Sequence, residues 1–320
     1  MRIHNLVSTK HAGLILTLLA SVAVAAAQPF GYVANQSSNS VVVVNRATNT
    51  IAATIPISGA GLSGLAVTPN GAYVYVTEES KNLVGVISTA TNSVVGSIAV
   101  GSEPVQVAFT PNGASAYVLN ELGGSVSVIN TATEEVAATI PVGTKPVGLA
   151  ITPNGTQVLV ANMTSSTISV ISTASNTVTA TWVALSGVNG IAVNGSKVYV
   201  TNQYANALTV YNLATGALLS TTLGFSAPNA VAVTPNGTQA YVTNGNSSSV
   251  WALNAATLAV ETKIAAGLLP TAVAVSADGT TAYVTSGYGY TLTKINTATN
   301  TIEDVMAKIG IYPFSVALYE

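Results

Sequence analysis

The stretch VAVTPNGTQAYVTNG, Val231–Gly245, decides the fold because near-copies of it recur along the chain. The copies include LAVTPNGAYVYVTE from Leu65, VAFTPNGASAYVLN from Val107 and LAITPNGTQVLVAN from Leu149. The turn glycine returns every 42 residues, apart from one step of 40, at Gly71, Gly113, Gly155, Gly195, Gly237 and Gly279. A fixed period of this length indicates a repeat architecture.

Each repeat contains four short, β-branched segments that are bounded by turn residues and read as strands. In one copy these are VGLAIT (Val147–Thr152), QVLVAN (Gln157–Asn162), TISVIS (Thr167–Ser172) and VTATWV (Val178–Val183). Four strands in about 40 residues are typical of one blade of a β-propeller. A β-helix has shorter coils, and a sandwich domain needs about 100 residues.

The two ends of the repeat region predict how the ring closes. The chain enters the repeats at a second strand, FGYVAN, and ends on PFSVALYE (Pro313–Glu320), which matches a first strand. A tyrosine near the start of the second strand recurs in each unit from Tyr32 onward, with leucine in its place once, and this gives seven units. We therefore expect an all-β, seven-bladed β-propeller of four-stranded antiparallel blades, in which the last segment completes the first blade and removes an exposed edge.

These motifs resemble those of a known family. AYVTN, AVTPNG, SVSVINTAT and ATIPVG are similar to the YVTN-type β-propeller repeats of exported and surface-layer-like bacterial and archaeal proteins, over Phe30–Glu320. The resemblance implies a seven-bladed propeller with a binding or scaffold role, and it supplies no common catalytic set.

The first 27 residues have the pattern of a secretory signal peptide. Arg2 and Lys10 precede the apolar run AGLILTLLASVAVA, and small residues lead to a cleavage site after Ala27. We expect residues 1–27 to be removed and residues 28–320 to form one extracytoplasmic domain in the periplasm, at the cell surface or secreted. The apolar run is short for a spanning helix, and no run after Ala27 reaches about 18 residues, so no transmembrane segment is expected.

Composition excludes several kinds of chemistry from the mature chain. Both histidines, His4 and His11, lie in the signal segment and there is no cysteine, so no imidazole base, histidine-bound zinc or c-type haem is expected. Only Asp278 and Asp304 remain as aspartates, which disfavours a calcium cage, and we expect neither metal nor cofactor. Loss of two positive charges takes the net charge from −2 to about −4, which gives no electrostatic reason to bind nucleic acid. We expect a monomer.

An acidic sector is the first departure from the repeat. Charged residues gather in the loops of two adjacent blades, at Glu78, Glu79, Lys81, Glu103, Glu121 and Lys145. They predict a patch for a cation or a cationic partner, with ordinary solvated loop charge as the alternative. Gln106 breaks a column of small residues along the predicted axis and should project toward the channel, as a ligand contact or as a polar plug.

An aromatic sector is the second departure. Tyr204, Tyr288, Tyr290 and Tyr312 lie in predicted loops beside asparagine, glutamine and glycine. Such rings suit a carbohydrate or peptide platform, and the alternative is that they pack against loop bases. The recurrent asparagines are expected to be hydrogen-bonding residues at strand ends, at Asn35, Asn120, Asn162, Asn202 and Asn244.

The leading hypothesis is an exported, non-catalytic propeller that recognises a protein, peptide or glycan through one loop face. Two alternatives stay open. One is a hydrolase or lyase that uses glutamates, such as Glu79 with Glu103 or Glu121, at the channel mouth. The resemblance of the fold to lactonase-type and streptogramin-lyase-type propellers bears on this alternative, although those enzymes use histidine and clustered carboxylates, often around a metal. The other alternative is a structural component of the cell envelope.

Overall fold

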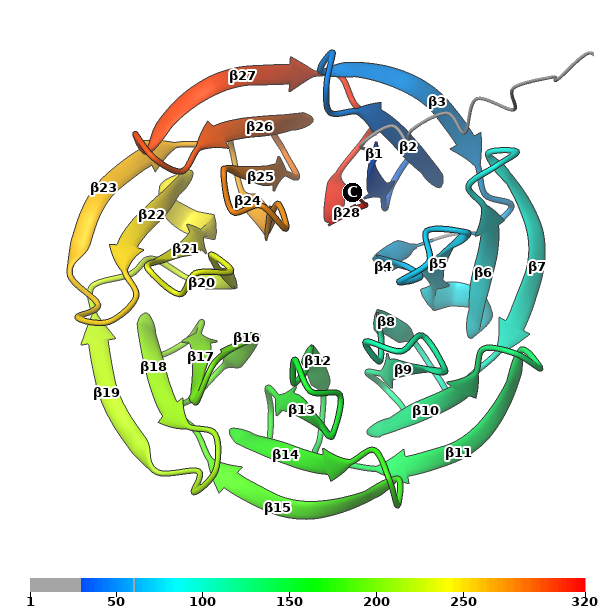
Figure 1. The fold of residues 1–320 in the computed structure, drawn as a ribbon, viewed down its shortest axis with the longest axis horizontal. Helices are drawn as coiled ribbons and strands as arrows, with labels where there is room; N and C mark the ends of the chain where they lie inside the picture. Colours follow the sequence, from blue (N-terminus) through cyan, green and yellow to red (C-terminus); the bar gives the residue numbers. More distant parts are fainter. Residues whose placement is uncertain (1–29, 60, 320) are drawn as a thin grey trace, which may run out of the picture.

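Seven sheets of four antiparallel strands surround a central axis in the computed structural model, which describes residues 30–59 and 61–319 (Figure 1). Each sheet, called a blade below, has an inner strand beside the axis and an outer strand on the perimeter (Figure 1). The prediction of a seven-bladed propeller is confirmed. The predicted signal peptide lies outside the described residues.

Each blade contains four strands that follow one another from the axis outward. Blade 1 contains β28 (Pro313–Leu318), β1 (Phe30–Asn35), β2 (Ser40–Asn45) and β3 (Thr50–Pro56); blade 2 contains β4 (Leu62–Val67), β5 (Tyr73–Glu78), β6 (Leu83–Ser88) and β7 (Ser93–Ala99). Blade 3 contains β8 (Pro104–Phe109), β9 (Ser115–Asn120), β10 (Ser125–Asn130) and β11 (Glu135–Pro141); blade 4 contains β12 (Pro146–Ile151), β13 (Gln157–Asn162), β14 (Thr167–Ser172) and β15 (Thr177–Val183). Blade 5 contains β16 (Val188–Asn194), β17 (Lys197–Asn202), β18 (Ala207–Asn212) and β19 (Leu218–Leu223); blade 6 contains β20 (Pro228–Val233), β21 (Gln239–Asn244), β22 (Ser249–Asn254) and β23 (Val260–Ala265). Blade 7 contains β24 (Pro270–Val275), β25 (Thr281–Ser286), β26 (Thr291–Asn296) and β27 (Thr301–Ala307), and two 3₁₀ turns are η1 (Glu79–Lys81) and η2 (Gly245–Ser247).

No helix within the described ranges is long and apolar enough to cross a bilayer.

The repeated Thr-Pro-Asn-Gly segment forms a five-residue loop rather than the tight two-residue hairpin that Asn-Gly suggests. Between β4 and β5, Asn70 Oδ1 accepts hydrogen bonds from Thr68 Oγ1 at 2.8 Å and from the Ala72 amide at 3.0 Å. Only the glycine has positive φ, with Gly71 at 70°. A type I′ hairpin requires positive φ at both central residues, so the asparagine acts here through its side chain.

The C-terminal strand closes the ring as the sequence predicts. β28 pairs antiparallel with β1, and the register places Tyr32 opposite Ala317 and Val33 opposite Val316. Val33 also belongs to an apolar cluster that includes Tyr283 and Leu292 of blade 7. The first and last blades are therefore joined by sheet hydrogen bonds and by a shared core.

Tyrosines of the second strands tie neighbouring blades together. Their hydroxyls donate to the outer turn of the next blade: Tyr117 to Asn176 Oδ1 at 2.7 Å, Tyr241 to Asn300 Oδ1 at 2.6 Å and Tyr199 to the Ala255 carbonyl at 2.9 Å. Each ring is almost fully buried. The recurrent tyrosine thus supplies both apolar packing and a directed contact between blades.

The recurrent asparagines are confirmed as hydrogen-bonding residues at strand ends. Their Nδ2 atoms donate to the third strand of the same blade, from Asn120 to Ser127 Oγ at 3.0 Å, from Asn162 to Ser169 Oγ at 3.0 Å and from Asn202 to Thr209 Oγ1 at 2.8 Å. The Asn35 amide reaches the Ile309 carbonyl at 3.0 Å. These side chains fix the ends of five of the seven second strands, directly before the loops that carry the candidate site.

Candidate functional site

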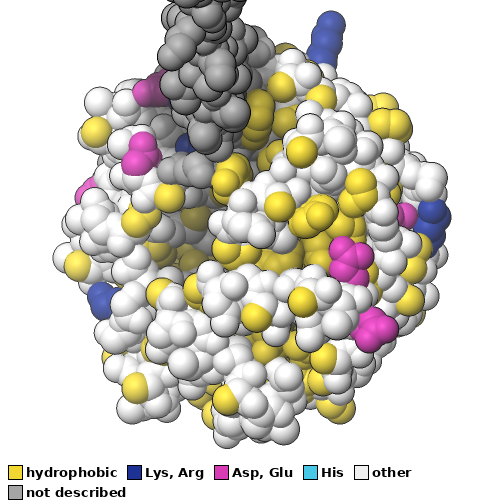
Figure 2. All heavy atoms as spheres, turned by 45° about the vertical axis from the view of Figure 1, so that its right-hand side comes forward, with side chains coloured by type: hydrophobic (Ala, Val, Ile, Leu, Met, Phe, Trp, Pro, Cys, Tyr) yellow, Lys and Arg dark blue, Asp and Glu magenta, His cyan; other side chains and the backbone are white. Residues whose placement is uncertain are grey.

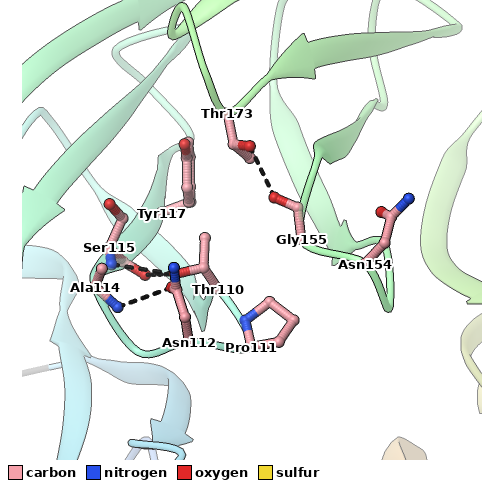
Figure 3. A pocket seen from close by; sticks show the side chains of 9 residues that line it. All are labelled: Thr110, Pro111, Asn112, Ala114, Ser115, Tyr117, Asn154, Gly155 and Thr173. Atoms are coloured by element: carbon pink, nitrogen blue, oxygen red, sulfur yellow. Dashed lines mark hydrogen bonds between the residues drawn. The ribbon is translucent and has the colours of Figure 1, made fainter.

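Two cavities between blades are products of the repeat. The cavity in Figure 3 has a volume of about 250 Å³ and is lined by turn residues that include Thr110, Asn112 and Gly155. Thr173 Oγ1 donates to the Gly155 carbonyl at 2.7 Å, and the same contact is made in the preceding blades by Thr131 and Thr89 (Figure 3). A second cavity of about 390 Å³, lined in part by Thr68–Asn70, lies at the same kind of position. Neither cavity shows chemistry of its own.

The central cavity, of about 580 Å³, differs because variable positions line it. It is bounded by the inner strands and by the loops between second and third strands. Figure 2 looks onto the opposite side of the ring, which carries the loops between first and second strands, and shows a hollow near the middle with hydrophobic side chains in its wall. A volume of this size suits a small-molecule ligand.

One backbone hydrogen bond per blade positions the residues at the mouth of this cavity. The residue after each second strand donates its amide to the carbonyl of the residue before the neighbouring inner strand, at 2.7–3.1 Å. We call the two residues a mouth pair. The seven mouth pairs are Gln36–Tyr312, Glu79–Gly61, Glu121–Glu103, Met163–Lys145, Gln203–Gly187, Gly245–Ala227 and Gly287–Leu269.

The carbonyl member of every mouth pair has positive φ, between 48° and 74°. Gly61 and Gly187 adopt this conformation without a steric penalty, whereas the other five members carry a side chain there. Such a residue costs about 1–2 kcal/mol in the left-handed region. Strained backbone of this kind is concentrated at functional sites, and Lys145, Leu269 and Tyr312 all reach the cavity.

Carboxyl groups occupy one side of the mouth. Gln36 Nε2 donates to Glu79 Oε1 at 3.3 Å, and Lys145 Nζ lies 3.4 Å from Glu121 Oε1. Burial raises the pKa of Glu79; the hydrogen bond from Gln36 opposes this, and the negative charges of Glu121 and Glu103 reinforce it. Glu79 therefore keeps its proton to a higher pH than an exposed glutamate does.

Amide and aromatic groups occupy the rest of the cavity. Gln203 Nε2 donates to Asn229 Oδ1 at 2.8 Å, and Asn229 Nδ2 donates to the Pro270 carbonyl at 3.1 Å. Gln106 projects into the cavity as predicted, and its Oε1 atom is buried without a hydrogen-bond partner among the described residues. A buried amide oxygen without a partner favours a ligand that can donate a hydrogen bond.

The structure brings six of the eleven predicted site residues together around the cavity: Glu79, Gln106, Glu121, Lys145, Tyr204 and Tyr312. The other five, Glu78, Lys81, Glu103, Tyr288 and Tyr290, do not line it. Glu103 is exposed, and the two tyrosines lie in an exposed loop.

Glu78 replaces the strand-end asparagine in blade 2 and is 4% exposed. Its Oε2 atom lies 3.5 Å from Lys81 Nζ, and that ammonium also donates to the Ser58 carbonyl. Gly85 stands where four of the other six third strands have a serine or threonine, and a Cβ atom there would lie 2.9 Å from Glu78 Oε1. Glycine therefore makes room for the longer glutamate, whose role is to hold η1 in place.

Several cavity residues were missed by the sequence analysis: Gln36, Met163, Gln203, Asn229, Thr271 and Phe314. Asn229, Thr271 and Phe314 are the second residues of inner strands β20, β24 and β28, whereas Gln36, Met163 and Gln203 share another column of the repeat, which could have identified them. Gln36, Glu79, Glu121, Met163 and Gln203 each follow the strand-end residue directly, and this column varies while its neighbour stays almost constant. Within residues 30–59 and 61–319, no three acidic, histidine or cysteine residues form a group that could hold a metal ion.

Fold and cavity together define a seven-bladed propeller with a ligand-sized pocket at its mouth. The family model described as "Lactonase, 7-bladed beta-propeller" matches residues 88–233. This range includes Gln106, Glu121 and Lys145 but not Glu79. The likeness supports the propeller family, while the narrower YVTN-type assignment stays a prediction.

Solved structures show the same fold at low sequence identity. Hydrazine synthase from Kuenenia stuttgartiensis is 21% identical with a TM-score of 0.78, over 83% of this chain and 92% of that one. A functionally unknown protein from Desulfotomaculum acetoxidans is 20% identical with a TM-score of 0.79, over 90% and 98%. A putative 6-phosphogluconolactonase from Bacteroides fragilis is 15% identical with a TM-score of 0.77, over 92% and 99%. Comparison with curated proteins gives no match.

Proposed function

We propose that the central cavity binds a neutral, polyhydroxylated small molecule, such as a sugar or a sugar lactone. The observation that carries this proposal is the position of Gln106, which lines a cavity of about 580 Å³ and whose buried Oε1 has no hydrogen-bond partner among the described residues. Gln36, Glu79 and Asn229 add groups that can exchange hydrogen bonds with hydroxyls. Phe314 and other apolar side chains can cover the C–H faces of a sugar ring.

The charge of the lining supports a neutral ligand. Two carboxyl groups, Glu79 and Glu121, line the cavity, and among the described lining residues Lys145 is the single cationic side chain. Its ammonium already lies 3.4 Å from Glu121. A phosphate group would meet more negative than positive charge here, so a phosphorylated sugar fits poorly. The substrate class therefore differs from the one that the name of the Bacteroides fragilis protein suggests.

Hydrolysis of a lactone or ester in the same cavity is the second candidate function. The raised pKa of Glu79 favours it, because a carboxyl group with a raised pKa is a better general base. Glu79 would take a proton from water as the water oxygen bonds to the carbonyl carbon. It would return that proton to the alkoxide when the ring C–O bond breaks. The match to the lactonase family model is consistent with this reaction.

Calorimetric titration of the purified protein tests binding, with D-glucose and D-glucono-1,5-lactone as neutral ligands and 6-phosphogluconate as the anionic comparison. We expect saturable binding of the neutral pair, weakened about five- to tenfold by Gln106→Ala through the loss of one ligand hydrogen bond. The variant Glu79→Gln replaces a lining carboxyl group by an amide, and Glu135→Gln, at an exposed position on β11, is its matched control. Preference for the phosphorylated compound, or equal affinity in Gln106→Ala, would contradict the proposal.

Hydrolysis is tested by following ring opening of the lactone by NMR against its spontaneous rate. Acceleration that Glu79→Gln removes and Glu135→Gln keeps would support the second candidate. A rate at the spontaneous level in the wild-type protein would reject it while leaving binding intact.

We also propose that residues 1–27 direct export. The charged start, apolar run and small residues before Gln28 support this. N-terminal sequencing of protein recovered from outside the cytoplasm should begin at or near Gln28. Retention of His11 in that protein would contradict cleavage.

A further inference from the structure

We propose that an aromatic track, formed by Tyr290, Tyr288, Tyr312 and Phe314, binds a neutral glycan chain and leads its end into the central cavity. The inference rests on the proposed function for the cavity end of the chain. It adds an interaction surface outside the cavity and a class of polymeric ligand.

Three rings of the track, those of Tyr288, Tyr312 and Phe314, form a continuous row from the rim to the cavity, and Tyr290 lies in the same loop as Tyr288. The rings of Tyr288 and Tyr312 meet edge to face with centroids 5.3 Å apart, and those of Tyr312 and Phe314 are stacked at 6.3 Å. Tyr312 and Phe314 line the cavity, whereas Tyr288 exposes 62% of its surface and Tyr290 exposes 42%. Aromatic surface therefore runs from solvent into the proposed site without a break.

Two residues of the track, Tyr290 and Tyr312, have a strained backbone conformation. Tyr290 has a φ of 55°, at the last loop position before a third strand. The other six blades place asparagine, serine or glycine there with the same sign of φ: Asn39, Asn82, Gly124, Ser166, Asn206 and Ser248. Tyr312 also has positive φ, at 57°. A bulky residue in this conformation is an outlier, and it persists where the side chain has a purpose.

Glycines hold the loop close enough for the rings to pack. A Cβ atom on Gly287 would lie 3.1 Å from the ring of Tyr312, and one on Gly289 would lie 3.1 Å from the Leu268 amide. Both contacts are tighter than those most side chains make. The alternation of glycine and tyrosine in residues 287–290 thus fits this packing.

Exposed apolar side chains in loops gather on the mouth side. All six exposed large apolar residues in loops of the described chain belong to loops of this side: Leu122, Tyr204, Leu268, Tyr288, Tyr290 and Ile311. Four of these, from Leu268 to Ile311, lie in or next to blade 7. Such clustering on one face of a protein marks an interaction site.

The charge around the track selects the occupant. In the loops 266–269, 286–290 and 308–312, and in the facing loop 36–39, Lys308 is the only charged residue. The acidic sector lies in other blades. A neutral chain with alternating hydroxyl and C–H surface matches tyrosine rings that lead to amides, whereas a basic peptide would favour the acidic sector. A β-1,4-linked glucose chain has this character, because its equatorial substituents leave apolar ring faces.

Titration calorimetry with glucose, cellotriose and cellohexaose tests the track. We expect affinity to rise with chain length, and we expect Tyr288→Ala and Tyr290→Asn each to lower cellohexaose affinity roughly three- to tenfold while leaving glucose affinity unchanged. Tyr290→Asn installs the residue that blades 1, 2 and 5 use, so its melting temperature should not fall. Tyr73→Ala, a 40% exposed tyrosine at the start of β5 on the opposite face, is the matched control.

The outcomes separate the two proposals. Glucose binding without any gain from chain length, or a gain that survives both tyrosine variants, would overturn the track and leave the cavity proposal standing. Cellohexaose binding that depends on Tyr288 and Tyr290 in the absence of glucose binding would support the track and overturn the proposed function. Binding of an aromatic or basic hexapeptide panel with no response to cellohexaose would also overturn the glycan assignment.

Discussion

Raising the pH above 10 should destabilise the propeller, because the buried tyrosines between its blades ionise more readily in the unfolded chain. Burial, with smaller contributions from Glu134 and Tyr73, raises the pKa of Tyr75 from 10.0 to about 12. Burial is also the largest cause of the raised pKa of the other buried tyrosines, Tyr32, Tyr117, Tyr199, Tyr211 and Tyr241.

The magnitude follows from the difference between the two states. Below pH 10 Tyr75 is protonated in both the folded and the unfolded chain, so it contributes no pH dependence. Above pH 10 the unfolded chain releases a proton that the folded chain retains, and stability falls as the pH rises. The loss is about 1.4 kcal/mol at pH 11 and approaches about 2.7 kcal/mol above pH 12. Tyr75 is 2% exposed, so solvent screens little of this effect.

Phenolate absorbance and far-ultraviolet circular dichroism, recorded on the same samples, provide the assay. A domain has about 5–15 kcal/mol of stability in total, so several such tyrosines should produce one cooperative alkaline transition in both signals. Tyr75→Phe should lessen the loss of urea stability between pH 10 and 11.5, relative to wild type. Full ionisation of the tyrosines near pH 10 with native circular dichroism would refute the reasoning.

Four further outcomes follow from the fold and the site. Deleting residues 313–320 should abolish cooperative thermal unfolding, since it removes the strand that closes the ring, and an unchanged melting curve would disprove the closure. Tyr241→Phe leaves the buried oxygen of Asn300 without its donor and should cost about 1–3 kcal/mol in urea unfolding, so a negligible change would show that the contact is not formed. Ala227→Gly should gain about 0.5–1 kcal/mol, because glycine accepts a φ of 48°, and a lower melting temperature would contradict the strain argument. Glu79→Gln should flatten the acid limb of the pH profile for ligand affinity or turnover, whichever is measured, since the carboxyl with the raised pKa is gone, and an unaltered profile would remove Glu79 from the site.

The repeat made the architecture predictable. The strand period, the turn glycines and the first-strand sequence at residues 313–320 predict the number of blades and the closure of the ring. Blade number and closure depend on local sequence and on sheet pairing alone. The column of small residues at the axis was predictable for the same reason. A Cβ atom on Gly64 would lie 2.5 Å from the Cα atom of Gln106, so the convergence of the inner strands leaves no room for a side chain at Gly64.

The site was only partly predictable, because it depends on which neighbouring loops meet. Glu78 and Glu79 are adjacent in sequence, yet Glu78 points back to Lys81 while Glu79 faces the cavity. Gln36 and Glu79 lie in different blades, and only the assembled ring joins their side chains. Tyr312 meets its partner Gln36 through the chain closure, a contact that no local pattern contains.

Closure by β28 also has a consequence for biosynthesis. Asn35 of β1 pairs with Pro313, 278 residues further along the chain. At about 5–20 residues per second, β1 would wait roughly 15 to 60 s with an unsatisfied edge before its partner is made. An edge of this kind invites pairing with other chains. The newly made chain should therefore depend on chaperones or on delayed folding until its last strand is available.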